Sequence, residues 1–109
     1  MPLEIAESDW KLLRKFNKSA LEHYCQAIIE EAGRLCGGAP QNSHERFLQL
    51  YRLVEGKDKE LGLLFDNMMR RSVAIEHICA LRGHSLIMDE EFSQFSSDLQ
   101  ERINFLLNF

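Results

Sequence analysis

Two consecutive arginines, Arg70 and Arg71, have the most unusual surroundings of any charged residues in this sequence. They stand between a pair of methionines and the apolar run Val-Ala-Ile, so we expect one of them to lie at the boundary of the core. A guanidinium in that position either caps backbone carbonyls or pairs with a carboxylate of a neighbouring helix. Alternatively, it lines a groove for a small anion. In that case His77 and Cys79, on the same expected helix, would complete a ligand site.

A second group of charges lies near the start of the chain. Lys11, Arg14, Lys15 and Lys18 follow the spacing i, i+3, i+4, i+7, which places all four on one side of a helix. The simplest interpretation is a solvated basic stripe. The alternative is contact with an anionic partner, for example the acidic start of another helix.

Metal sites have little support in the sequence. His44-Glu45 begins an HExxH string, but the position of the second histidine is occupied by Leu48. His23 and His77 are each preceded, three positions earlier, by alanine, so the ExxH step of a di-iron bundle does not occur. We expect neither a metal nor a cofactor, and leave open only a mononuclear site that joins His23, His77 and a carboxylate.

Catalytic motifs are equally scarce. His23 and Cys25, like His77 and Cys79, are two residues apart, which turns them about 200° away from each other on a helix. The chain contains no GxSxG string, and its glycines lack the Lys-Ser/Thr pair of a phosphate-binding loop. The sequence therefore indicates a protein that is not an enzyme, and acid-base catalysis by a carboxylate or histidine is the weakest of our hypotheses.

Composition sets the class of protein. The chain has 109 residues, a length that predicts one domain over residues 1–109, and we expect this domain to be helical. Its 13 basic and 17 acidic side chains argue against DNA binding. We expect no secretory signal and no membrane span, because no apolar run approaches about 20 residues. Three cysteines without CxxC spacing favour the reducing cytoplasm.

The first helix is expected to begin with Ser8 or Asp9 as its N-cap and to end at Gly37-Gly38. A main apolar stripe recurs at gaps of three and four residues, through Trp10, Leu13, Phe16, Ala20, Tyr24, Ile28, Ala32 and Leu35. A second stripe lies beside it and holds Leu12, Leu21, Cys25, Ile29 and Cys36. Because two stripes are wider than a two-helix seam needs, this helix is expected to touch two neighbours or another chain.

Further helices follow the turn residues GGAPQNS. The second carries Phe47, Leu50, Tyr51 and Val54 on one face, and we favour a break or kink at Gly56 over a continuous helix. The third is then expected to start at Asp58 and to end at the Arg-Gly-His-Ser run, with Gly83 as a left-handed C-cap. The last is expected to run from Asp89 without interruption, and its apolar C-terminal end to dock on the bundle or on a dimer interface.

These helices predict an all-α fold, an antiparallel bundle of three to four helices with a long first helix. At about 27 residues that helix would be about 40 Å long, against about 26 Å for the diameter of a compact chain of this size. Part of it is therefore expected to project, and a second copy of the chain is the simplest cover for its wide apolar surface.

Three segments together resemble a family of small, uncharacterised bacterial helical proteins: SDWKLLRKF, MMRRSVAIEHI and EEFSQFSSDLQERINFLL. Members of that family carry names such as peptide chain release factor and multidrug transporter. This chain has neither the Gly-Gly-Gln motif of the first nor the membrane spans of the second. The resemblance implies a bacterial cytoplasmic helical module and no particular activity.

Two functions follow as hypotheses. The first is a noncatalytic protein-protein interaction module that self-associates as a homodimer through its first helix and presents a patch to another protein. The second is a small-ligand or metal-binding bundle, with Arg70, Arg71, His77 and Cys79 beside a cavity. A large apolar interface would distinguish the first, and a pocket with converging polar groups the second.

Overall fold

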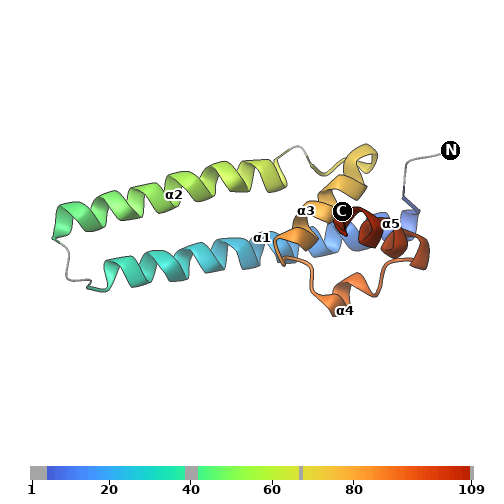
Figure 1. Ribbon diagram of the computed structural model, residues 1–109, viewed down its shortest axis with the longest axis horizontal. Coiled ribbons are helices and arrows are strands. Elements are labelled where there is room, and N and C mark those ends of the chain that lie inside the picture. The colour runs from blue at the N-terminus through green and yellow to red at the C-terminus, as the bar shows by residue number, and fades with distance from the viewer. Residues whose placement is uncertain (1–4, 39–41, 67, 109) are drawn as a thin grey trace.

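The computed structural model describes residues 5–38, 42–66 and 68–108, and within them it contains helices and no strand (Figure 1). The all-α fold class is confirmed. There are five α-helices rather than three or four, and the first is the longest. In chain order they are α1 (Glu7–Cys36), α2 (Ser43–Phe65), α3 (Ala74–Gly83), α4 (Asp89–Phe92) and α5 (Ser97–Leu107), with a 3-10 turn at Arg71–Val73 before α3.

Helix α1 follows the apolar spacing of the sequence over 30 residues and ends where the two glycines were expected to end it. Gly38 adopts a φ of 109°, a backbone conformation that residues with a side chain rarely adopt. The expected start was wrong, because the N-cap is Ala6 and not Ser8 or Asp9. The Asp9 side chain is instead buried and accepts a hydrogen bond from the amide of Ser96, the residue before α5.

Helix α2 is continuous through Gly56, so the expected break at that residue was wrong. Its start is capped by the Asn42 side chain, which accepts a hydrogen bond from the Glu45 amide at 2.9 Å. Across the glycine, Glu55 and Lys59 lie 4.0 Å apart at i, i+4 spacing. Such pairs favour the helix and offset part of the roughly 1 kcal/mol that glycine costs there.

The third helix also differs from the expectation. It does not start at Asp58, because α2 ends at Phe65 and the chain turns before the 3-10 segment and α3. At the end of α3 the left-handed residue is Ser85, with φ 58°, and not Gly83, which is still helical. Arg82 holds this turn by donating to the carbonyl oxygen of Ile87 at 2.9 Å.

The last expected helix is split in two. Residues 93–96 separate α4 from α5, and Ser96 caps α5 by accepting a hydrogen bond from the Leu99 amide. The Asp9 carboxylate of α1 accepts hydrogen bonds from the Ser96 amide at 2.8 Å and from its hydroxyl at 2.6 Å. These contacts with α1 replace the helical hydrogen bonds lost at the break.

The core lies at one end of the molecule (Figure 1). Phe16 of α1 packs edge-on against Phe95, with 5.5 Å between ring centroids. Helix α3, the two C-terminal helices and the first half of α1 form this end, which we call the head. Phe105, Leu106 and Leu107 remain exposed at the end of α5, and Phe109 lies outside the described residues.

The other end is a two-helix hairpin (Figure 1). We use hairpin for residues 25–36 of α1 and 43–63 of α2, which run antiparallel and project from the head. The molecule measures 58 × 27 × 25 Å and has a radius of gyration of 17.1 Å. A compact chain of this size has a radius near 13 Å. The expected projection is therefore present, and α2 accompanies α1 along it.

Candidate functional site

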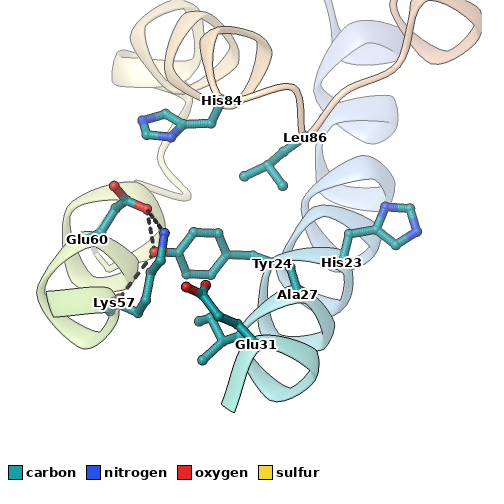
Figure 2. A pocket seen from close by; sticks show the side chains of 9 residues that line it. His23, Tyr24, Ala27, Glu31, Lys57, Glu60, His84 and Leu86 are labelled. Atoms are coloured by element: carbon teal, nitrogen blue, oxygen red, sulfur yellow. Dashed lines mark hydrogen bonds and ion pairs between the residues drawn. The ribbon is translucent and has the colours of Figure 1, made fainter. Parts of the chain in front are cut away.

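A tyrosine fixes the base of the hairpin (Figure 2). Tyr24 of α1 is buried, and its hydroxyl donates to Glu60 Oε1 of α2 at 2.6 Å and lies 3.2 Å from the Lys57 carbonyl oxygen. Burial, and then this bond, raise the pKa of Tyr24 above its ordinary value. The same bond is the main cause that lowers the pKa of Glu60. Tyr24 thus joins α1 to α2 as a neutral hydrogen-bond donor.

A depression of about 230 Å³ opens beside this tyrosine, between the two helices and the turn after α3. Glu31, Lys57, Glu60 and His84 surround it, whereas the His23 ring points away from Tyr24 (Figure 2). Its charges are mixed, which suits a small polar molecule. Within the described residues, no group of three or more His, Cys, Asp or Glu side chains could hold a metal ion.

The ligand site expected around the arginine pair is not assembled. Arg71 Nη1 donates to Glu7 at 2.8 Å and Nη2 donates to the Ile5 carbonyl oxygen at 2.9 Å, so this side chain both pairs with a carboxylate and caps a carbonyl. Arg70 is exposed and precedes the 3-10 turn. His77 is fully buried in the core, and Cys79 is half-buried. The structure therefore assigns Arg71 to fastening the N-terminal segment and His77 to the core.

The basic stripe is present as the spacing predicted. Lys11, Arg14, Lys15 and Lys18 are all exposed and line a shallow depression on α1 together with Ser19. None of the four makes an ion pair with a described residue, whereas Arg71, Arg82 and Arg102 each do. The stripe is thus a surface of uncompensated positive charge on the head.

The hairpin also has an uncovered apolar side, which follows from how its helices meet. Tyr24 and Ile28 of α1 face Leu53 and Glu60 of α2. The residue after each of these lies 100° further round its helix. Because α1 and α2 run antiparallel, the residues that follow the contact positions in both helices lie on the same broad side of the hairpin.

On that side most of the residues are apolar and exposed, although the exposed Asp58, four residues after Val54, also lies there. The large ones are Leu21 and Ile29 of α1, at 37% and 64% exposure, and Phe47, Tyr51 and Val54 of α2, at 50–61%. Cys25 and Cys36 complete the set, which we call the open face. Near the hairpin tip it is hollowed by about 250 Å³ beside Cys36 and Phe47.

The opposite side of the hairpin is mostly polar, and the exposed Leu63 is its exception. The residues just before the positions at which α1 and α2 face each other lie on this opposite side. They include His23, Arg34, Glu45, Arg52 and Lys59, and all of these are exposed. The difference between the two sides makes the open face a distinct surface. Its α1 residues belong to the second apolar stripe of the sequence, so the periodicity detected this surface, but only the pairing with α2 shows that it stays uncovered in a single chain.

Comparisons of the chain with protein-family models, curated proteins and solved structures found no match. The resemblance to small bacterial helical proteins therefore stays a prediction. Among the described residues, no helix combines the length and apolar content that crossing a membrane requires.

Proposed function

We propose that this protein is a noncatalytic protein-protein interaction module that self-associates as a homodimer through the open face. The observation that carries the proposal is the contrast between the two ends of the molecule. Every buried residue lies in the head or at its junction with the hairpin, and no described residue from Cys25 to Leu63 is buried. The hairpin is thus half of a helical bundle, and a second hairpin would complete a four-helix core.

The size of the open face fits a stable dimer. Two helices about 10 Å apart, paired over the 16 residues from Leu21 to Cys36, present a flat area of about 24 by 20 Å, and their surface relief adds accessible area. A standard interface buries about 800 Å² on each partner. Covering the exposed half of a large apolar side chain contributes about 1 kcal/mol. With five such residues in each copy, the gain is of the order needed to offset the roughly 4–15 kcal/mol cost of association.

A pair of matched variants tests the proposal. Val54→Glu places a charge on the open face, and Leu63→Glu places one on the opposite side of the same helix, nine residues later. Both side chains are exposed in the single chain, at 50% and 80%, so neither change disturbs the core. By native mass spectrometry we expect dimers for the unmodified chain and for Leu63→Glu, and monomers for Val54→Glu. A monomeric unmodified chain, or a dimeric Val54→Glu variant, would contradict the proposal.

A cytoplasmic location and an anionic protein partner for the basic stripe belong to the same proposal. The free thiols of Cys25, Cys36 and Cys79 support the location. The unpaired charges of the stripe support the partner, while the acidic balance of the chain disfavours DNA in that role.

The second candidate function is small-ligand binding in the depression beside Tyr24. It is favoured by the mixed charges of Glu31, Lys57 and His84 around an accessible volume of about 230 Å³. The same mass spectra test it, because a retained ligand adds mass to the chain. That mass should be lost in a Lys57→Ala variant.

A further inference from the structure

We infer that the second copy binds antiparallel, so that the two heads lie at opposite ends of the dimer and its two-fold axis passes close to Ile29 and Val54. This inference rests on the proposed function and adds the arrangement of the partner on the open face. The choice of the antiparallel arrangement rests on the basic stripe, which lies on α1 between the open face and the far end of the head.

Two-fold symmetry allows two ways to place one open face on another. With the axis parallel to the helices, both heads lie at the same end. With the axis across the helices, the hairpins overlap and the heads lie at opposite ends. Both arrangements bury the same apolar residues, so burial alone does not choose between them.

The basic stripe lies on the same side of α1 as the open face. Lys18 is seven residues before Cys25, Arg14 is seven before Leu21, and Lys15 is fourteen before Ile29. Seven residues are close to two helical turns, so each of these cations lies in line with an open-face residue. The open face therefore passes, toward the head, into four positive charges that have no ion-pair partner among the described residues.

With the heads at the same end, α1 of each copy faces α2 of the other, so the two stripes lie diagonally across the interface, about 14 Å apart for helices packed at about 10 Å. That distance is less than two Debye lengths at physiological salt, so screening weakens the repulsion between the eight cations without removing it. In the antiparallel arrangement the centres of the stripes lie about 43 Å apart along α1. Over several Debye lengths their repulsion is screened, and both stripes stay accessible beyond the partner's tip.

The register follows from the limits of the open face. On α1 it extends from Leu21 to Cys36, whose midpoint is close to Ile29. At the same level of the hairpin, α2 carries Val54. Antiparallel pairing about this level places Ile29 against its symmetry mate and Val54 against its own.

Small-angle X-ray scattering of the unmodified chain, with light scattering for its mass, tests the inference. The single chain is 58 Å long. The axis at Ile29 lies about 17 Å from the hairpin tip, so opposed heads give a maximum dimension of about 80 Å and heads at the same end give about 65 Å. A dimer of about 80 Å supports the inference. A dimer of about 65 Å overturns it and leaves the proposed function standing, whereas a monomer overturns both.

Thiol cross-linking is an independent test of the register. In a chain with Cys25→Ser, Cys36→Ser and Cys79→Ala, Ile29→Cys should cross-link to itself with a short bifunctional reagent. Leu63→Cys in the same chain is the control and should not, because residue 63 lies on the opposite side of the hairpin. Cross-links that form only between Ile29→Cys and Val54→Cys chains, and not between two Ile29→Cys chains, would overturn the antiparallel register.

Discussion

His77 is a buried ionisable side chain. Its exposed fraction is 0%, and among the described residues neither ring nitrogen has a partner that meets hydrogen-bond geometry. Burial lowers the pKa of His77 below its ordinary value of 6.5, and the nearby backbone of Met68 opposes this only in part. The neutral imidazole thus fills space between α3 and the rest of the core, as an apolar side chain would.

His77→Leu should therefore change how stability depends on pH. Because the pKa of His77 is lower in the folded state, the unfolded chain takes up more protons as the pH falls below about 6.5. The contribution of His77 to stability is complete above that pH and is lost as the pH falls toward the folded-state pKa. The leucine variant should be within about 1 kcal/mol of the unmodified chain at pH 7.5 and should lose less stability by pH 5.5.

Urea unfolding at the two pH values measures this difference. His44→Gln is the matched control, because His44 is exposed on α2 and its replacement removes a histidine without changing the core. Equal losses for His77→Leu and the unmodified chain would show that His77 is not the group responsible.

At this scale the sequence predicted only what neighbouring residues decide. One of the two arginines, Arg70 or Arg71, was expected to cap a carbonyl or pair with a carboxylate, because a guanidinium within an apolar stretch needs such partners, and Arg71 does both. Asp9 has the residue type of an N-cap, and the sequence placed it at the start of its own helix. Its partner, Ser96, is 87 residues away, and no local pattern points to a contact of that range.

At the scale of elements, α2 was the principal difference. The expected break relied on the weak helix propensity of Gly56 and on the charged residues after it. In the structure Gly56 is exposed, with no atom within 4 Å of the position a Cβ would take. The charged residues lie on the surface of the helix, and their i, i+3 and i, i+4 pairs support it.

Gly56→Ala should stabilise the chain by about 0.5–1 kcal/mol, because alanine has the higher helix propensity and meets open space here. Thermal unfolding followed by the helical circular dichroism signal measures the change. Gly38→Ala serves as the opposite case and should destabilise the chain, since its φ of 109° disfavours any side chain. A destabilising Gly56→Ala change would mean that the helix does break at this residue.

The split between α4 and α5 shows what periodicity does and does not determine. Phe92, Phe95, Leu99 and Ile103 were expected on one apolar face, and all four are buried. Their burial was predictable because spacings of three and four residues suit one side of a helix. The interruption at residues 93–96 was not, because it depends on the Asp9 carboxylate of α1.

At the scale of the whole molecule, stability is divided unevenly. The head contains the fully buried side chains, among them Leu13, Ile78, Leu81, Ile87 and Ile103. The hairpin is held by Tyr24 at its base and by half-buried contacts along its length. Isolated helices without tertiary burial are marginal in water, so in the single chain the hairpin should open more readily than the head.

Hydrogen exchange at two protein concentrations tests this division together with dimer formation. In dilute solution, where monomers predominate, the amides of α2 from Ser43 to Leu63 should exchange faster than those of α3 and α5. At high concentration only the hairpin amides should slow, because the second copy covers the open face and leaves the head as it was. In the Val54→Glu variant the hairpin amides should exchange rapidly at both concentrations. If the hairpin were as protected as the head in dilute solution, its own two helices would supply the missing stability, and the open face would lose its strongest physical reason to bind a partner.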